Sequence, residues 1–239
     1  NLARNGKLEA VLTGKGLNAE QRRALVLDVE RGVTNGGEIL PWQTDTCIGS
    51  WHYERSVFEQ HRYRTAKQVS QMLIDIVSKN GNLQLSIPLP GRGVPDDDEL
   101  KFLSDFTAWM DVNSEGIHAT RPWKVYGEGP SVTGPQERGQ FGGARDVRAY
   151  TSEDMRFTMK GDSLYAFLMV WPETRATVIK SLATSSPQLD GRKVAEVSLL
   201  GYGGKLEWTQ DAQGLHVKLP DQPPCQYAVT LKIKGALSA

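Results

Sequence analysis

The sequence predicts two successive units of different fold class, an α/β unit and then an all-β unit. In the first half, apolar strand-like runs alternate with amphipathic helical patterns, which is typical of a mostly parallel sheet covered by helices. In the second half, short strand-like segments recur between turn signals, which is typical of an antiparallel β-sandwich. A closed eight-stranded β/α barrel takes about 250 residues by itself. Because the whole chain has 239 residues, we expect the first unit to be a partial (half) β/α barrel.

Charge and hydropathy exclude several classes of partner. Lys plus Arg and Asp plus Glu number 28 each, so the net charge is zero and a basic nucleic-acid or membrane-binding footprint is not expected. No apolar run is long enough to span a bilayer. The chain begins at Asn1 without a secretory signal pattern, and we expect it to be a trimmed sequence. The compartment stays open, with a periplasmic or secreted location compatible.

Metal and cofactor sites are not expected from the residue types that usually form them. Cys47 and Cys225 are the two cysteines, and they are far apart in sequence. They form neither a metal-ligand motif nor a disulfide framework, so we expect reduced, partly buried thiols. The four histidines are scattered without metal-ligand spacing. The sequence therefore predicts no metal and no organic cofactor.

The elements of the first unit follow from apolar periodicity. Residues 8–13 and 24–29 are expected strands, and residues 39–49 are expected to be extended. Residues 65–78 form the clearest helix, with Thr65 as its N-cap and apolar side chains at helical spacing. A strand over residues 82–89 comes next. The helix after it starts at a capping box, and its apolar face is Leu100, Leu103, Phe106, Trp109 and Met110.

The boundary between the units is expected near residue 145. Residues 124–145 are rich in Gly and Pro, which indicates a linker or a covering loop. We therefore assign residues 1–145 to a partial barrel with its linker and residues 146–239 to a β-sandwich. The strands expected in the second unit are residues 154–158, 163–170, 177–181, 193–199, 206–209, 214–218 and 228–234.

Two carboxylates end the second expected strand and are the first candidates for chemistry. Asp28 and Glu30 are two residues apart, so on a strand they point to the same side of the sheet. Glu30 falls at the carboxyl end of the strand, where α/β proteins place catalytic groups. The alternative is a surface glutamate at a strand end, paired with Arg31 or with a helix. A carboxylate inside an apolar strand must be paired or hydrogen-bonded, so Asp28 is either structural or an adjunct to Glu30.

Aromatic and polar side chains crowd the following segment, which includes Trp42, Asp45, Trp51 and His52. The two tryptophans lie among Gly, Ser, Thr and Asp, which favours a sugar-binding wall over a core position. Asp45 is either a turn residue, or an acceptor for a sugar hydroxyl or a catalytic partner. His52 either binds a hydroxyl or is a satisfied structural histidine. Paired carboxylates beside aromatic side chains are typical of glycoside hydrolysis.

Several linked motifs resemble one enzyme family. These are PWQTDTCIGSWHY at residues 41–53, VSKNGNL at residues 77–83 and NSEGIHATRP at residues 113–122, with residues 150–172 similar to the start of that family's C-terminal sandwich. The sequence is similar to the α-L-fucosidases of glycoside hydrolase family 29. The resemblance covers most of the chain but only the latter half of the family's length. It departs at Gln43, where the family often has Glu, and in the spacing between Trp42 and Cys47.

The resemblance implies retaining hydrolysis of terminal α-L-fucosides, with transfer to sugars as a side reaction, on a fucosylated oligosaccharide or glycoconjugate. The best match for the family acid/base is Glu30, with Asp28 as a fallback nucleophile. Trp42, Asp45, Trp51 and His52 are the implied substrate contacts. The family's own nucleophile, an Asp in a Trp-x-Asp motif, is expected before Asn1. Trp109-Met110-Asp111 has that spelling but ends a helix, and we reject it.

A half barrel leaves sheet edges open, so we expect a homo-oligomer that completes the barrel, or pairing with a missing N-terminal half. Two other readings remain open at this point. The chain can be a non-catalytic carbohydrate-binding remnant, or it can be an inactive C-terminal fragment of a fucosidase. The distinguishing feature is whether a second carboxylate approaches Glu30.

Overall fold

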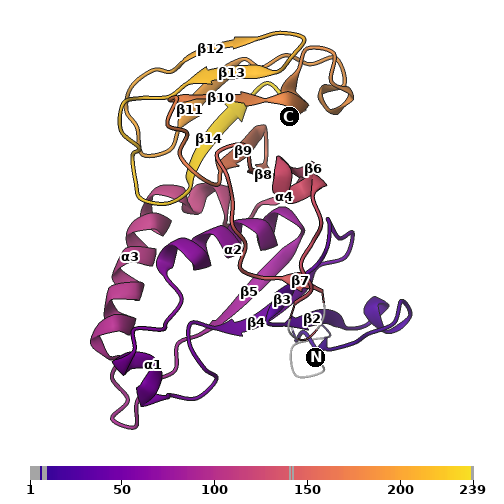
Figure 1. Cartoon of the computed structure of the whole chain (residues 1–239). Helices are drawn as coiled ribbons and strands as arrows, with labels where there is room; N and C mark the ends of the chain where they lie inside the picture. Colours follow the sequence, from indigo (N-terminus) through magenta and orange to yellow (C-terminus); the bar gives the residue numbers. More distant parts are fainter. Residues whose placement is uncertain (1–5, 7–9, 140, 142, 238–239) are drawn as a thin grey trace.

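The computed structural model describes residues 6, 10–139, 141 and 143–237 of the chain. Figure 1 shows a parallel sheet with its helices at one end of the molecule and two antiparallel sheets at the other. Among the described residues, no helix combines the length and apolar character needed to cross a membrane.

A four-stranded parallel sheet forms the first part of the molecule. Its order is β1-β2-β4-β5, and its strands are Thr13–Gly14, Val26–Glu30, Trp42–Cys47 and Gly81–Ser86. The prediction of a parallel sheet is thereby confirmed. A strand was expected over residues 8–13, and the structure has only β1 there. Residues 8 and 9 lie outside the described residues. The strand expected over residues 82–89 begins one residue earlier and ends at Ser86.

Two helices pack on one face of this sheet. Helix α2 (Ala66–Ser78) and helix α3 (Asp97–Asn113) begin at the capping boxes formed by Thr65 with Gln68 and by Asp96 with Glu99. Both helices were predicted, together with their capping residues. A five-residue helix, α1 (Arg55–Glu59), precedes them. Apolar side chains of the strands, helices and connecting loop form one cluster there, namely Leu27, Val29, Val33, Trp42, Ile48, Ala66, Val69, Met72, Ile76, Leu83, Leu85 and Phe102.

Strand alternation places polar side chains on the opposite face. Asp28 lies directly opposite Gln43 in the register, and Glu30 lies opposite Asp45. The same row continues on β5, where Gln84 lies opposite Asp45. Because residues two apart on a strand share a face, the helix-covered face is apolar and the other is polar.

Two antiparallel sheets form the second part. The five-stranded sheet has the order β11-β14-β9-β8-β6, and the three-stranded sheet has the order β10-β13-β12. One buried apolar cluster takes side chains from both sheets, among them Phe157, Leu199, Val217 and Leu231. The strands are β6 (Arg121–Glu128), β8 (Met155–Lys160), β9 (Ser163–Leu168), β10 (Ala176–Ile179), β11 (Glu196–Leu199), β12 (Glu207–Gln210), β13 (Leu215–Lys218) and β14 (Val229–Lys234).

The predicted linker is partly wrong. Residues 121–128 form β6, which pairs with β8 across a register shift. The side chain of Trp123 is buried in the second core and makes an edge-to-face contact with Phe157, so this segment is anchored despite its glycines. The rest of the expected linker contains α4 (Pro130–Thr133) and β7 (Ala144–Arg145), which pairs with β3 (Gly32–Val33).

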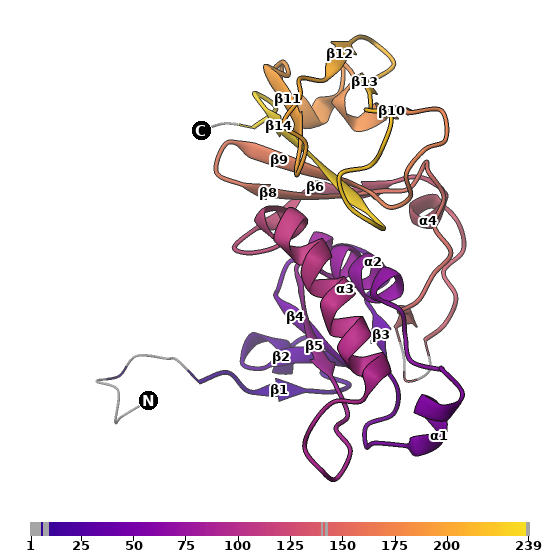
Figure 2. The same cartoon turned by 90° about the vertical axis from the view of Figure 1, so that its left-hand side faces the viewer.

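Helix α2 lies between the parallel sheet and the five-stranded sheet, as Figures 1 and 2 both show. Its Gln71 side chain donates to the Met169 carbonyl oxygen at 2.7 Å. On α3, the Trp109 indole donates to the Ala228 carbonyl oxygen at 2.8 Å, and this side chain is buried. Trp109, Met110 and Asp111 lie near the end of α3, which is where the sequence analysis placed them.

Candidate functional site: three carboxylates around one lysine

Three carboxylates meet around the ammonium group of Lys15. Its Nζ lies 3.1 Å from Asp28 Oδ2, 3.2 Å from Glu30 Oε2 and 2.9 Å from Asp45 Oδ2. Asp28, Glu30 and Asp45 were each singled out from the sequence, and the structure brings them together. Lys15 was missed by sequence reasoning.

The parallel pairing explains why these residues meet. Lys15 directly follows β1, Glu30 ends β2, and Asp45 lies opposite Glu30 on β4. All lie toward the carboxyl ends of neighbouring parallel strands, where polar side chains from different strands converge. Positions 15, 30 and 45 are far apart in sequence, so only the β1-β2-β4 strand order makes them neighbours.

The charges in the cluster are unequal, with three carboxylates facing one ammonium group. Partial burial disfavours the charged form of Lys15. Its hydrogen bonds to Asp45, Asp28 and Glu30 outweigh that effect and raise the pKa of Lys15 above its usual value. Lys15 is therefore a permanent cation at neutral pH, and it relieves the repulsion among the three carboxylates.

Exposure separates the three acids. The Asp28 side chain is 8% exposed and also accepts a hydrogen bond from Gln43 at 3.4 Å. The Glu30 side chain is 26% exposed and the Asp45 side chain is 21% exposed. Glu30 and Asp45 can therefore be reached by a ligand, whereas Asp28 is held largely behind them.

A pocket of about 410 Å³ is lined by Lys15, Asp28 and Glu30 of this cluster but not by Asp45. Its polar lining also includes Glu38. Residues 34–36 form one wall, and Phe141 with Gly143 form another. The pocket is thus an acidic hollow with loop walls and one half-exposed aromatic side chain, Phe141.

Arg31 is a second cation at the same sheet edge, and the sequence reasoning named it only as a partner for Glu30, which the structure pairs with Lys15 instead. Its Nη2 donates to Cys47 Sγ at 2.8 Å and to the Gly49 carbonyl oxygen at 3.1 Å. The guanidinium carbon lies 5.4 Å from the centre of the Trp51 ring. The signal for a role at this edge is its position directly after Glu30, at a strand end.

The two tryptophans occupy different environments. Trp51 is 38% exposed and stacks with Arg31 beyond the end of β4, which suits a ligand contact. Trp42 is fully buried, and its indole donates to the Lys79 carbonyl oxygen at 3.0 Å. It packs against Gly81, where an added Cβ would lie 2.5 Å from the ring. The expectation that Trp42 forms an exposed wall is corrected: it belongs to the core on the helix-covered face.

His52 is exposed in the loop after Trp51. In the described parts of the chain, no group of three or more His, Cys, Asp and Glu side chains is placed to hold a metal ion. Cys47 is buried and Cys225 is half-buried, both as free thiols, as the sequence predicted.

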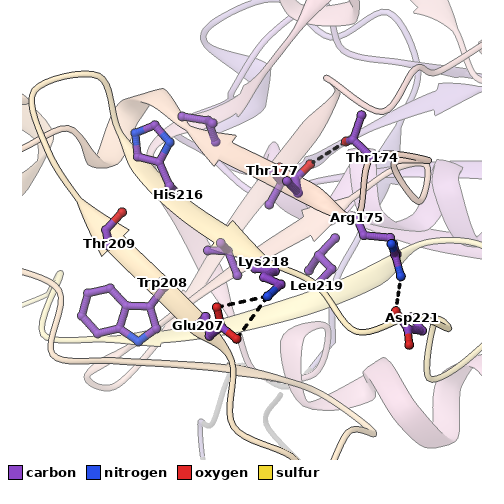
Figure 3. Close-up of a pocket in the computed structure, with 13 residues that line it drawn as sticks. Thr174, Arg175, Thr177, Glu207, Trp208, Thr209, His216, Lys218, Leu219 and Asp221 are labelled. Carbon is purple, nitrogen blue, oxygen red and sulfur yellow. Dashed lines mark hydrogen bonds and ion pairs between the residues drawn. The ribbon is translucent and has the colours of Figure 1, made fainter.

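A larger pocket of about 680 Å³ lies on the three-stranded sheet, away from the carboxylates (Figure 3). Its charged side chains are paired with one another, Glu207 with Lys218 and Arg175 with Asp221. None of the residues predicted to carry chemistry lies there, so the carboxylate pocket is the better candidate site despite its smaller size.

Comparison with known proteins assigns both parts of the chain to one family. A family model described as Alpha-L-fucosidase matches residues 9–115, and one described as Alpha-L-fucosidase C-terminal domain matches residues 149–234. The human tissue α-L-fucosidase is 26% identical over 201 residues, which is 81% of this chain and 37% of that protein. The α-L-fucosidase of Branchiostoma floridae is 27% identical over 214 residues, 85% of this chain and 41% of that protein.

A solved structure shares the fold. An α-L-fucosidase of Bacteroides thetaiotaomicron, described as a trapped covalent intermediate of a Glu-to-Gln variant, has a TM-score of 0.63 and 15% identity. It is covered over 43% of its length by 87% of this chain. The chain therefore spans about two fifths of the length of the relatives that it matches.

Proposed function

Because this chain belongs to the α-L-fucosidase family, with family models matching residues 9–115 and 149–234, we propose that it contributes the acid/base side of a retaining α-L-fucosidase active site. The observation that carries the proposal is the convergence of Asp28, Glu30 and Asp45 around Lys15 at the carboxyl ends of parallel strands. A retaining glycosidase needs two carboxyl groups about 5–5.5 Å apart. The cluster supplies one of these two groups, Glu30, and the source of the second is proposed below.

Glu30 is proposed as the acid/base. In the first step its carboxyl proton passes to the glycosidic oxygen as the bond from that oxygen to the anomeric carbon breaks. A second carboxylate attacks the opposite face and forms a glycosyl-enzyme. In the second step Glu30 takes a proton from water, and the water oxygen displaces the enzyme carboxylate. Glu30 ends its strand and is partly exposed, which supports this role better than the position of Asp28 does.

The nucleophile has to be a carboxylate other than Glu30. Asp28 is the fallback within this chain, because it shares Lys15 with Glu30. Its side chain is 8% exposed and bonded to Gln43, so it has little freedom to attack an anomeric carbon. We therefore propose that the nucleophile is a carboxylate supplied by a neighbouring copy in the assembly that completes the barrel. The covalent intermediate described for the Bacteroides thetaiotaomicron relative supports a retaining course.

The substrate is proposed to be a terminal α-L-fucoside on an oligosaccharide or glycoconjugate, with transfer to sugars as a side reaction. Asp45, at 21% exposure beside Glu30, is placed to accept a hydrogen bond from a sugar hydroxyl. Trp51 and His52 lie beyond the carboxyl end of β4 and are proposed as contacts to the ring or the leaving group. No metal or organic cofactor enters this mechanism.

We also propose the domain arrangement that the sequence predicts. Residues 1–145 correspond to a half β/α barrel and residues 146–239 to a β-sandwich, with β6 reaching from the first unit into the sheet of the second. Strands β1 and β5 lie at the two ends of the parallel sheet, and within the described residues no strand pairs with their outer edges. Val11 and Leu12 beside β1 are each 69% exposed. These open edges support a homo-oligomer that completes the barrel.

Hydrolysis of a chromogenic aryl α-L-fucoside by the purified chain tests the proposal, with Glu30→Gln and Glu59→Gln compared. Glu59 is an exposed glutamate paired with Arg55, so its variant controls for the loss of a surface charge. We expect Glu30→Gln to lower the turnover at least 100-fold and Glu59→Gln to leave it within twofold. Equal turnover in both variants would contradict the role of Glu30. Binding of fucosides without any turnover would favour the carbohydrate-binding remnant.

A further inference from the structure

A buried ion cluster joins the two parts of the molecule and has no role in the proposed reaction. Asp75 and Lys79 are one turn apart on or just after α2, and Arg156 is on β8. Lys79 Nζ lies 2.8 Å from Asp75 Oδ2, and Arg156 Nε lies 2.6 Å from Asp75 Oδ1. All three side chains are at most 2% exposed.

Removing these charges from water costs free energy, and the attraction between them does little more than offset that cost. The cluster by itself therefore adds little to the stability of the fold. One carboxylate serves two cations, and the Tyr126 ring lies 5.2 Å from Lys79 Nζ and 5.6 Å from the Arg156 guanidinium carbon. The centre of the Tyr150 ring lies 5.4 Å from the same guanidinium carbon. Fully satisfied buried networks of this kind fix one geometry of the groups that they contact.

Lys79 connects the ion cluster to the wall of the carboxylate pocket. Its ammonium group donates to the Thr34 carbonyl oxygen at 3.1 Å. Its own carbonyl oxygen accepts from the Glu38 amide at 3.2 Å. Lys79 thus contacts both ends of the segment 34–38, and that segment lines the pocket through Thr34, residues 35–36 and Glu38.

The neighbouring residue reinforces the contact. Asn80 Nδ2 donates to the Glu38 carbonyl oxygen at 3.2 Å and to the Ile39 carbonyl oxygen at 3.1 Å. Asn80 adopts a positive φ of 72°, a conformation that Asn tolerates better than most residues. The turn after α2 therefore holds residues 34–39 through the side chains of Lys79 and Asn80 and through the backbone of Lys79.

We propose that Lys79 is a positioning residue for the carboxylate pocket. Held by Asp75, which Arg156 of the second unit holds in turn, it fixes the segment 34–38 of the pocket that Glu30 also lines. The assignment of this wall to an active site rests on the proposed function. The series of contacts from β8 through α2 to residues 34–38 does not depend on the proposed function.

Hydrogen exchange followed by mass spectrometry tests the link without reference to activity. Lys79→Met removes the ammonium group and keeps a buried side chain of similar length. Lys101→Met is the matched control, because Lys101 forms an i,i+4 pair with Asp105 that is exposed on α3. We expect Lys79→Met to speed exchange in residues 34–39 at least tenfold while β14 changes less than twofold. We expect Lys101→Met to change neither segment.

Unchanged exchange in residues 34–39, or equal acceleration in that segment and β14, would overturn the proposal. If Lys79→Met does not fold, the same ratio is read in Lys79→Leu, which also lacks a donor toward Thr34. The kinetic readout is separate. If the native protein hydrolyses an aryl α-L-fucoside, Lys79→Met is expected to reduce kcat/KM at least tenfold, whereas Lys101→Met leaves it unchanged. An exchange effect in a protein without turnover would retain the link and reject the proposed function alone.

Discussion

Glu30 and Asp45 lie directly opposite each other on the paired parallel strands β2 and β4, and both carboxylates contact the same ammonium group. The backbone reinforces this pairing, because the Arg31 amide donates to the Asp45 carbonyl oxygen at 3.0 Å. Two acids in register on neighbouring strands are fixed relative to each other more firmly than acids on loops. That rigidity is what acid/base chemistry at a sugar requires.

Lys15 is expected to matter more for activity than for stability. Lys15→Met removes the only side chain that contacts Asp28, Glu30 and Asp45 together among the described ion pairs. Because the lysine side chain is about half exposed, we expect its loss to change the free energy of unfolding by less than about 1 kcal/mol. We expect kcat/KM to fall at least tenfold, because the carboxylates then repel one another. Urea unfolding and fucoside hydrolysis measure the two effects, and an unchanged kcat/KM would contradict the role.

Substitution of Trp42 is expected to lower the stability of the fold, whereas substitution of Trp51 is expected to weaken the binding of fucosides. Trp42→Ala empties a fully buried site and should lower the free energy of unfolding by about 3–5 kcal/mol. Trp51→Ala removes a partly exposed ring stacked on Arg31 and should cost less than about 1 kcal/mol. We expect Trp51→Ala to raise KM for fucosides instead. Thermal unfolding of both variants decides the matter, and similar losses would mean that Trp51 is also a core residue.

Low pH is expected to lower the free energy of unfolding because it protonates Asp75. Burial alone would raise the pKa of Asp75, but Arg156 and Lys79 outweigh it and hold that pKa well below its usual range. A carboxyl group with a lowered folded-state pKa contributes stability that is complete above its unfolded pKa of about 3.9 and is lost as the pH falls further. Urea unfolding between pH 2 and pH 5 should therefore show a slope below about pH 4 that Asp75→Asn flattens. An identical slope in the variant would contradict this assignment.

The open edges of the parallel sheet predict association. The chain has a mass of 26.4 kDa, so light scattering behind size exclusion should give a multiple of that value. We expect Val11→Lys with Leu12→Lys to shift the protein toward the monomer, because charged side chains at an edge oppose pairing. A monodisperse 26.4 kDa species in the unaltered protein would contradict the proposed homo-oligomer.

Local signals in the sequence were enough to predict the helices and their capping residues. The capping boxes at Thr65 and Asp96 need only side chains three residues apart, and both are present. The shared face of Asp28 and Glu30 also follows from strand alternation alone. The meeting of Lys15 with Asp28 and Asp45 could not be predicted, because it depends on which strands pair.

The misassignment of Trp42 could have been avoided by the same alternation. Trp42 and Asp45 are three residues apart on β4, so they must face opposite sides of the sheet. A wall that contains Asp45 cannot contain Trp42. Strand β6 was missed for another reason: its glycines indicated a linker, whereas Trp123 anchors the segment in the second core.

The identity of Glu30 as the acid/base is tested most directly by Glu30→Ala with an activated aryl α-L-fucoside and sodium azide. Without its acid/base the enzyme still forms the glycosyl-enzyme from a good leaving group, but water is no longer activated to release it. Azide needs no general base, so it should restore turnover and attack from the side that water uses. We predict α-L-fucosyl azide, identified by NMR. A β-L-fucosyl azide would make Glu30 the nucleophile, and turnover that is unaffected by the substitution would remove Glu30 from the mechanism.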